Sequence, residues 1–454
     1  MRKVLIANRG EIACRVMRSC RALGLGTVAV YSEADRNALH VSLADEVYAI
    51  GPAPARQSYL VADNILAAAS ASGADAIHPG YGFLADNAAF ARAVAAAGLA
   101  WIGPDPDSIE DMGDKERARL LAKSAGLPVL PGSPRFHMGE RAGLETAAAE
   151  VGYPLLVKAS AGGGGIGMRR VDRPQELAQV VEATQGMAEK SFGDGTIYLE
   201  RLVAKARHVE IQVFGFGDGR AVHLYERDCS IQRRFQKILE ESPAPDLATV
   251  RRRAMAEAAV ALCRQERYRG AGTVEFVLDA ETDAFYFLEM NTRIQVEHPV
   301  TEMNTGLDLV ALQIRLARGD DLGDLAQESI RADGHAIEAR IYAENPARNF
   351  LPSPGPLEEF RLPEPTVGLR IDTGVRQGDQ ITFHYDPMIA KMIGHGTSRA
   401  EAIERLLAGL GEVRVEGVTT NVPFLGRVLD HPAFRQGDVF TGFVARHQAD
   451  LIGA

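Results

Sequence analysis

The chain has 454 residues, which exceeds one ordinary hydrophobic core and predicts two to four domains. Its formal net charge of -10 argues against nucleic acid as a main partner, because phosphate backbones are bound by basic faces, but a small anionic ligand remains compatible. Four scattered cysteines form no CxxC pair, so we expect buried free thiols and a cytoplasmic protein.

The first hundred residues alternate strand and helix signals. The opening segment reads as a strand, with no signal peptide before it, and helical, often alanine-rich segments separate the strands that follow. This alternation predicts a parallel sheet with helices on its faces. The expected strands are 4–7, 27–31, 46–50, 76–78 and 101–103.

The middle of the chain has a different pattern. Asp114 is a good N-cap and predicts a helix after it. From residue 153 to 291 we expect mostly strands of an antiparallel sheet, interrupted by one long helix at about 249–268. The expected strands are 155–159, 197–202, 208–214, 221–225, 273–278 and 285–291.

The last third begins with a helix at 306–319 that ends at a glycine. An acidic connector follows, and a strand-rich region starts at 335 and ends in helices such as 400–410. Within it, the apolar run 388–393 resembles a buried strand, so we reject Lys391-Met392 as a biotin attachment site. No uncharged apolar stretch is long enough to span a membrane.

A polar row gives the most informative pattern. In Glu289-Met-Asn-Thr-Arg-Ile-Gln-Val-Glu297, polar residues occupy every second position. If the segment is extended, all five point the same way, and the mostly apolar residues between them pack on the other side. Two carboxylates, two amides and a guanidinium suit metal binding, anion binding and proton transfer. The alternative is an exposed amphipathic strand that carries salt bridges.

Glu275 lies in a predicted strand that could pair with 285–291. Together with Glu289 and Asn291 it would form a site for a hard cation such as Mg²⁺, which takes oxygen ligands and leaves room for nucleotide phosphates. A pair of surface glutamates is the alternative.

The glycine run 161–167 follows the strand that ends near Lys158. Glycines approach phosphates closely, but the run matches neither GxGxxG nor the Walker pattern, and a plain flexible loop fits equally well. Lys158, Lys115 and Lys237 supply point charges for phosphates. Arg340, on a predicted strand, suits a carboxylate or enolate oxygen, although a structural salt bridge is the more common use.

Together these motifs resemble biotin carboxylases over nearly the whole chain. The resemblance runs from Ile6-Ala-Asn-Arg-Gly-Glu-Ile-Ala13 through His78-Pro-Gly-Tyr-Gly-Phe-Leu84 and Glu226-Arg-Asp-Cys-Ser-Ile-Gln-Arg-Arg234 to the stretch 289–302 and Phe350-Leu-Pro-Ser-Pro-Gly355. The stretch 289–302 is the most specific. The segment 385–391 is more similar to the α subunits of acyl-CoA carboxylases than to the bacterial acetyl-CoA carboxylase subunit.

The resemblance implies an α/β and α+β fold of three domains. These are an N-terminal Rossmann-like (pre-ATP-grasp) domain at 1–112, an ATP-grasp domain at 113–320 with a mobile lid at about 131–203, and a C-terminal biotin carboxylase domain at 331–447. The activity implied is MgATP-dependent carboxylation of biotin with bicarbonate through carboxyphosphate. Biotin would be a substrate on a separate carrier protein or domain. A carboxyltransferase and a homodimer or larger complex are also implied.

The resemblance also assigns roles to individual residues. Lys115 and Lys158 would contact the phosphates of ATP beneath a lid loop at Gly164 and Gly165. The nucleotide site would include Glu200, Arg201, Leu202, Val203, His208, Gln232, Glu275 and Glu289. Mg²⁺ or Mn²⁺ would be held by Glu275, Glu289 and Asn291. Bicarbonate would be held by Lys237, Arg293, Gln295 and the backbone of Val296, with Glu297 as the base and Arg340 facing the ureido oxygen of biotin.

Two positions depart from the family pattern. Ile166 stands where the lid commonly has a cation, and Phe235 stands where many relatives have a histidine that bonds ribose. A different ATP-grasp ligase would share the predicted metal ligands Glu275, Glu289 and Asn291, but not the complete polar row 293–297 together with Arg340. A non-catalytic ATP-binding subunit would not need an intact polar row. A Rossmann oxidoreductase is disfavoured because no GxGxxG follows the first strand.

Overall fold

The computed structural model describes residues 1–160 and 167–452. The predicted lid glycines Gly164 and Gly165, and the departure at Ile166, lie outside the described residues.

Five short parallel strands form the N-terminal sheet, in the order β3-β2-β1-β4-β5. Both faces are buried: Val4 and Ile6 of β1 pack into one apolar cluster, and Leu5 packs into another on the opposite face. Burial on both faces is typical of parallel sheets and confirms the alternation read from the sequence. The elements are β1 (Lys3–Ile6), α1 (Gly10–Ala22), β2 (Gly26–Ser32), α2 (Leu39–Leu43), β3 (Glu46–Gly51), α3 (Ala62–Ser72), β4 (Ala76–His78), α4 (Ala88–Ala96), β5 (Ala100–Trp101) and α5 (Pro106–Gly113).

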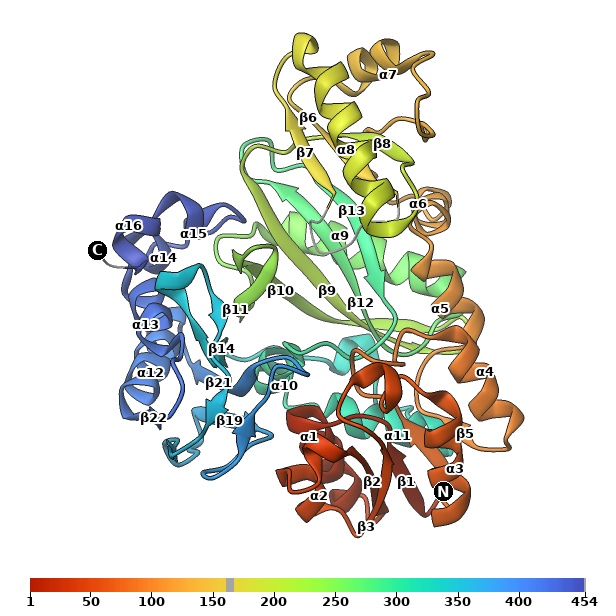
Figure 1. Cartoon of the computed structure of the whole chain (residues 1–454), viewed down its shortest axis with the longest axis vertical. Helices are drawn as coiled ribbons and strands as arrows, with labels where there is room; N and C mark the ends of the chain where they lie inside the picture. Colours follow the sequence, from red (N-terminus) through yellow and green to blue (C-terminus); the bar gives the residue numbers. More distant parts are fainter. Residues whose placement is uncertain (161–166, 453–454) are drawn as a thin grey trace.

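Helix α6 (Lys115–Ser124) begins where Asp114 predicts it, because the Asp114 carboxylate accepts hydrogen bonds from the backbone N–H groups of Glu116 and Arg117. Beyond it, a small three-stranded sheet projects from the body at the top of Figure 1. Its elements are α7 (Leu144–Val151), β6 (Leu155–Ala159), β7 (Met168–Val171), α8 (Leu177–Phe192) and β8 (Ile197–Arg201).

Helix α8 corrects the expectation of a single long helix between 153 and 291. Its buried residues recur at helical spacing, a period that the expectation of strands overlooked; they are Leu177, Val181, Thr184, Gln185 and Ala188. Leu177 and Val181 pack in the apolar cluster that also contains Leu155, Val157 and Leu199 of the small sheet.

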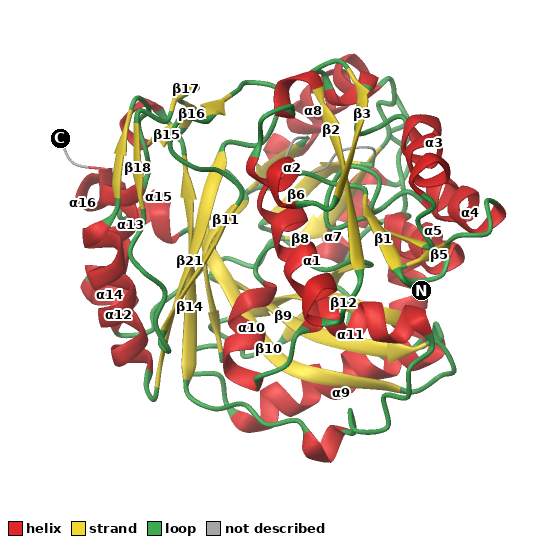
Figure 2. Ribbon diagram, turned by 90° about the horizontal axis from the view of Figure 1, so that it is seen from below, coloured by secondary structure: helices red, strands yellow, loops and turns green. Residues whose placement is uncertain are grey.

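An eight-stranded antiparallel sheet occupies the centre, in the order β13-β12-β9-β10-β11-β14-β21-β19. It runs without interruption from the middle of the chain into the C-terminal region, because β11 pairs directly with β14. Figure 2 shows β11, β14 and β21 side by side. The strands are β9 (Ala206–Phe216), β10 (Ala221–Arg233), β11 (Gln236–Ser242), β12 (Arg269–Asp279), β13 (Phe285–Asn291), β14 (His335–Tyr342), β19 (Leu369–Thr373) and β21 (Met388–Gly396).

Helices cover this sheet and complete its cores. Helix α9 (Thr249–Gln265) packs on β9 and β10, and α12 (Arg399–Glu412) packs on β21. The remaining helices are α10 (His298–Thr305), α11 (Leu309–Arg318), α13 (Val422–Asp430), α14 (Pro432–Arg435), α15 (Phe443–Arg446) and α16 (Gln448–Ile452). Short strands are β15 (Glu344–Asn345), β16 (Leu351–Pro352), β17 (Gly355–Pro356), β18 (Glu359–Arg361), β20 (Gln380–Ile381) and β22 (Arg414–Glu416).

The polar row from 289 to 297 is extended only in its first part. Strand β13 ends at Asn291, and α10 begins at His298. Between them the chain turns, because the backbone N–H of His298 bonds the carbonyl of Gln295, and the His298 ring contacts the same carbonyl at 2.6 Å. The expectation of one strand with five side chains on one face is therefore wrong beyond Asn291.

All four cysteines are buried and free, as expected. Among the helices of the described residues, none combines the length and apolar character needed to cross a lipid bilayer.

Candidate active site

Two glutamates face each other across neighbouring strands. Strands β12 and β13 pair as predicted, with Glu275 opposite Glu289 and Thr273 opposite Asn291. Burial raises the pKa of Glu289, and the negative charge of Glu275 raises it further. The Asn291 amide donates to Glu275 Oε1 at 3.0 Å. Two adjacent carboxylates and an amide, with repulsion between the charges, fit a divalent cation that prefers oxygen ligands.

Lys237, on β11, lies at the centre of the site. Its Nζ contacts Glu210 Oε2 at 2.7 Å, Glu275 Oε1 at 2.8 Å and Glu297 Oε1 at 2.7 Å. It also donates to Gln295 Oε1 at 3.3 Å. Burial alone would lower the pKa of Lys237, but the three carboxylates raise it well above its ordinary value. A permanent cation is thus held where an anion could bind.

Glu297 connects this cation to a second one. Its Oε2 lies 2.9 Å from Arg340 Nη2, while its Oε1 contacts Lys237. Burial favours the neutral carboxyl, but Lys237, Arg340 and Arg227 hold the pKa of Glu297 below its ordinary value. Glu297 is therefore ionised and able to accept a proton, although its two cations make it a weak base until one of them engages a ligand.

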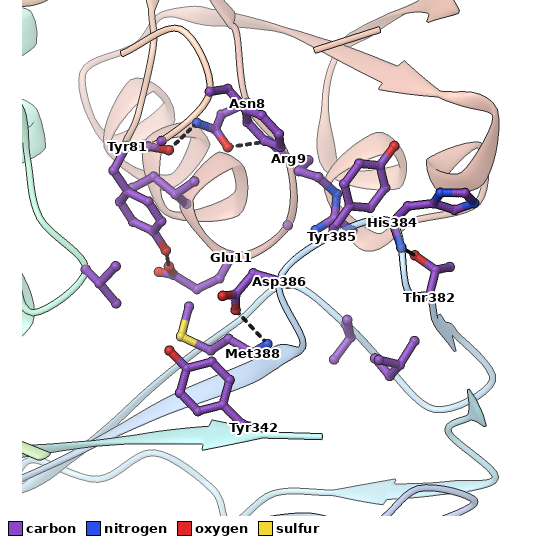
Figure 3. Close-up of a pocket in the computed structure, with 18 of the residues that line it drawn as sticks. Asn8, Arg9, Glu11, Tyr81, Tyr342, Thr382, His384, Tyr385, Asp386 and Met388 are labelled. Carbon is purple, nitrogen blue, oxygen red and sulfur yellow. Dashed lines mark hydrogen bonds between the residues drawn. The ribbon is translucent and has the colours of Figure 1, made fainter. Parts of the chain in front are cut away.

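Arg340, on β14, lines a cavity of about 620 Å³ between the N-terminal and C-terminal regions. Arg293 and Val296 also line it. In Figure 3, Tyr81 and Glu11 point toward each other at one end of this cavity, where the Tyr81 hydroxyl donates to Glu11 Oε2 at 2.6 Å. The cavity thus contains an arginine of the predicted biotin site and two members of the predicted bicarbonate set.

Arg293 lies at the edge between the cavity and the carboxylate pair. Its Nε contacts Asp86 Oδ2 at 2.8 Å, and its Nη2 donates to Asn291 Oδ1 at 3.2 Å. The Gln295 amide donates to Glu275 Oε1 at 3.0 Å. The turn after β13 therefore brings Gln295 and Glu297 to Lys237, although these residues are not on a strand.

On the predicted nucleotide side, His208 Nε2 lies 2.9 Å from Glu275 Oε2, and the Gln232 amide lies 2.9 Å from His208 Nδ1. Burial opposes the charged imidazole, but Glu275 raises the pKa of His208. Lys115 lines a second cavity, of about 170 Å³, together with Glu289 and Asn291. These contacts gather His208, Gln232 and Lys115 around the carboxylate pair.

A separate group of predicted residues lies on the small projecting sheet. Lys158 of β6 forms an ion pair with Glu200 of β8, and the Leu202 N–H donates to the carbonyl of Pro154 at 3.2 Å. Arg201 is exposed, and Leu202 and Val203 are half-buried. Among the described residues, no hydrogen bond or ion pair joins this group to Lys237 or its carboxylates.

Two buried glutamates of the site were not predicted. Glu210 bonds both Lys237 and Arg227, and Glu240 Oε1 lies 2.6 Å from Arg340 Nη2. Glu210 follows His208 by two residues on a strand with alternating sides, a signal that could have identified it. Nothing in the local sequence distinguishes Glu240 from its neighbour Glu241, which pairs with Arg399 instead.

Lys391 and Phe235 occupy defined positions in the structure. Lys391 is fully buried in β21, where its Nζ donates to the Val296 carbonyl at 2.8 Å and pairs with Glu11 Oε1 at 3.0 Å. It is therefore inaccessible for biotin attachment, as expected. Phe235 is 64% exposed at the turn between β10 and β11.

Comparison with family models covers most of the chain. Residues 1–109 match "Biotin carboxylase, N-terminal domain", residues 114–325 match "Carbamoyl-phosphate synthase L chain, ATP binding domain", and residues 338–446 match "Biotin carboxylase C-terminal domain".

Curated relatives agree with these matches. The chain is 51% identical over 452 residues to the α subunit of mitochondrial methylcrotonoyl-CoA carboxylase from Oryza sativa, covering 99% of this chain and 61% of that protein. It is 48% identical over 457 residues to biotin carboxylase 1 of Bacillus subtilis, covering 100% of both. The chain thus spans about 61% of the length of the rice relative.

Solved structures have the same fold. The biotin carboxylase domain of 2-oxoglutarate carboxylase from Hydrogenobacter thermophilus, in complex with MgADP, ADP and bicarbonate, superposes with a TM-score of 0.93 at 44% identity, covering 100% of this chain and 99% of that one. A biotin carboxylase from Campylobacter jejuni, described as a β-γ-ATP complex, has a TM-score of 0.93 at 40% identity, covering 98% of this chain and 99% of that one.

Proposed function

This chain belongs to the biotin carboxylase family, and we propose that it carboxylates biotin with bicarbonate at the expense of MgATP. It would act as an ATP-dependent ligase that forms a C–N bond and would supply the first half-reaction of a biotin-dependent acyl-CoA carboxylase. The observation that carries the proposal is the bridge that Glu297 makes between Lys237 and Arg340.

The first step joins bicarbonate to phosphate. A bicarbonate oxygen attacks the γ-phosphorus of ATP, the bond to the ADP oxygen breaks, and Glu297 accepts the bicarbonate proton. Lys237, Arg293, Gln295 and the Val296 backbone would hold the bicarbonate anion for this attack. Because Lys237 and Glu297 are in contact, anion binding beside Lys237 would bring the proton within reach of Glu297.

The nucleotide would lie between the projecting sheet and the central sheet. Lys115 and Lys158 would contact phosphates, His208 and Gln232 would complete the site, and residues 200–203 would line the adenine. Glu275, Glu289 and Asn291 would hold Mg²⁺ or Mn²⁺, which neutralises charge on the phosphates when bound.

The second step uses the cavity beside Arg340. Carboxyphosphate splits into CO₂ and phosphate, the phosphate takes the proton from N1 of biotin, and N1 bonds to the carbon of CO₂. The ureido oxygen gains negative charge as N1 loses its proton. Arg340 would stabilise that oxygen from a buried position, where a fixed cation is most effective.

We further propose a biotin carrier protein or domain and a carboxyltransferase as partners, in a homodimer or larger complex. Domains at 1–112, 113–320 and 331–447, with a lid at about 131–203, remain our proposed division of the chain. The scattered cysteines favour the cytoplasm, which cell fractionation would test.

The decisive experiment measures ADP release from MgATP with and without bicarbonate and free biotin, together with ¹⁴C fixed on biotin. We expect bicarbonate-dependent ADP release and acid-labile ¹⁴C-biotin. ADP release that requires an amine or another carboxylate instead of bicarbonate would refute the proposal and indicate a different ATP-grasp ligase.

A further inference from the structure

Two buried glutamates are cross-strand neighbours next to Arg340. Strands β11 and β14 pair so that Glu240 stands directly opposite Glu338, and Figure 2 shows the two strands side by side. Residues that are directly opposite in an antiparallel pair have Cβ atoms about 4.5–5.5 Å apart on one face of the sheet. Glu338 is 0% exposed and Glu240 is 1% exposed. The two carboxyl groups are therefore close together and away from bulk water.

Glu338 has no hydrogen-bond partner within the part of the chain that the structure describes. Both of its carboxyl oxygens are buried without one. Its cross-strand neighbour on the other side is Ile393 of β21, which packs with Ala336 and with Val300 of α10 in a small apolar cluster. An ionised carboxylate in such surroundings costs much more free energy than a neutral carboxyl group. The packing around Glu338 therefore favours its protonated form.

Glu240, in contrast, has a cationic partner. Its Oε1 lies 2.6 Å from Arg340 Nη2, and Arg340 follows Glu338 by two residues on the same face of β14. Burial raises the pKa of Glu240 to about 7. Burial also raises the pKa of Glu338 well above its ordinary value, and the negative charge of Glu240 raises it further. Because Arg340 stabilises one carboxylate and not the other, Glu240 ionises first and Glu338 keeps its proton.

Other titratable and charged groups also surround the pair. They are Cys229 of β10, Lys237 of β11, Glu297 in the turn before α10, His298 and Glu302 of α10, and Lys391 of β21. The two lysines contact other carboxylates, and Glu302 pairs with two arginines. Burial raises the pKa of the Cys229 thiol and lowers the pKa of the His298 imidazole, so both groups stay neutral. Arg340 is therefore the cation that balances the pair.

We infer that Glu240 and Glu338 act together as positioning residues for Arg340: at about pH 8, Glu338 keeps a proton and donates a hydrogen bond to the ionised Glu240 carboxylate, which holds the guanidinium. One negative charge on the pair fixes Arg340 without cancelling its attraction for an oxyanion. A neutral pair would leave Arg340 to Glu297 alone and weaken that base. The inference rests on the proposed function, because the direction of Arg340 matters only if the ureido oxygen of biotin approaches it.

The first test replaces Glu338 by glutamine and by leucine. Glutamine still donates to Glu240 but cannot ionise, whereas leucine fills the space without a donor. At about pH 8 we expect Glu338→Gln to carboxylate biotin within about threefold of wild type and Glu338→Leu to lose about tenfold. The bicarbonate-dependent ATPase without biotin should change less than about threefold in both variants, because Lys237 still contacts Glu297. Ile393→Val is the matched control, because Ile393 adjoins Glu338 and carries no charge.

The pH dependence separates a positioning role from a purely structural one. Without its donor, the ionised form of Glu240 is less stable. The midpoint of the pH dependence of carboxylation should therefore be higher by about 1 in Glu338→Leu than in wild type, and near the wild-type midpoint in Glu338→Gln. A structural defect would instead lower the rate by the same factor at every pH.

Infrared spectroscopy detects the proton directly and needs no turnover. The spectrum of wild type minus that of Glu338→Gln, at about pH 8, should contain the carbonyl band of a protonated carboxyl group. Absence of this band, equal carboxylation by the two variants, or an unchanged midpoint in Glu338→Leu would overturn the inference. Should Glu338→Leu fail to fold, the presence or absence of the band decides. A wild-type chain that shows the band but never carboxylates biotin would refute the proposed reaction and not the retained proton.

Discussion

Replacing Arg340 by glutamine should separate the two steps of the proposed reaction. Arg340 pairs with Glu240 and Glu297, and it lines the cavity for biotin, but within the described part of the chain it pairs with neither Glu275 nor Glu289. We expect Arg340→Gln to disable carboxybiotin formation while largely sparing the bicarbonate-dependent ATPase measured without biotin.

The magnitudes follow from the neighbours of Arg340. Loss of one donor to a developing oxyanion costs about 10²–10³ in rate. The ATPase depends on ionised Glu297, whose pKa would rise without Arg340 but would still be held down by Lys237 at 2.7 Å. Because an ordinary glutamate has a pKa of about 4.3, Glu297 stays ionised near pH 7.5, and we expect the ATPase to fall less than about threefold.

The fold should survive this substitution. Breaking a buried ion pair typically costs about 3–5 kcal/mol, mainly because a charge is left without its partner. Burial already raises the pKa of Glu240 to about 7 despite Arg340, so Glu240 can take up a proton when the arginine is removed. The cost in stability should therefore lie at or below the low end of that range.

The assay records ADP release and ¹⁴C fixed on biotin for wild type, Arg340→Gln, Glu297→Gln and the control Arg399→Gln. Arg399 pairs with the neighbouring Glu241 and does not line the cavity, so its variant should keep both activities. Glu297→Gln should lower both together, by about 10²–10⁴-fold. If Arg340→Gln loses basal ATPase as severely as carboxylation, Arg340 serves phosphoryl transfer or the fold, and its assignment to biotin fails.

Three further predictions concern metal and pH. Glu289→Gln should weaken metal affinity at least about 10–100-fold, detectable as Mn²⁺ binding in the presence of ADP; normal turnover at limiting Mg²⁺ would contradict the metal assignment. Burial raises the pKa of Glu240 to about 7, so Glu240 is an ionised partner of Arg340 only above that pH. The carboxylation rates of Glu240→Gln and wild type should therefore differ at pH 8 and converge below pH 7. A ratio of the two rates that stays constant with pH would exclude this role. Burial lowers the pKa of His40 to about 4. Below about pH 6.5 the unfolded chain therefore binds a proton that the folded chain does not, and the free energy of unfolding should fall as the pH drops from 6.5 toward 4. Urea unfolding should show His40→Gln losing about 2 kcal/mol less than wild type between pH 6.5 and 5, and equal losses would rule this out.

Local patterns were sufficient for much of the fold. The N-terminal strands were predictable because each is short, apolar and separated from the next by a helix. The pairing of β12 with β13 was predictable because Glu275 and Glu289 lie on two predicted strands that follow each other directly along the chain. Helix α8 was missed although its buried residues recur at helical spacing, because the strand signals on both sides of it set the expectation for the whole region. The turn after Asn291 was missed because polar and apolar residues continue to alternate through it.

The arrangement of the site was less predictable. Lys237 meets glutamates at 210, 275 and 297, which come from two strands and a turn, and no local pattern reports such a meeting. The resemblance to biotin carboxylases supplied the expected roles of Arg340 and Glu297, which residue types alone left open. Glu240 was not found by either route, because its importance comes from a cross-strand neighbour 100 residues away.

The pairing of β11 with β14 limits how this protein can be divided. Two family models meet between residues 325 and 338, which suggests a modular boundary for cloning. A fragment that stopped there would leave the backbone of 236–242 as an open strand edge and expose Ile238 and Leu239, which pack into the C-terminal cluster. Open edges of this kind recruit other chains and promote aggregation. The last two family segments should therefore be inherited, expressed and recombined together.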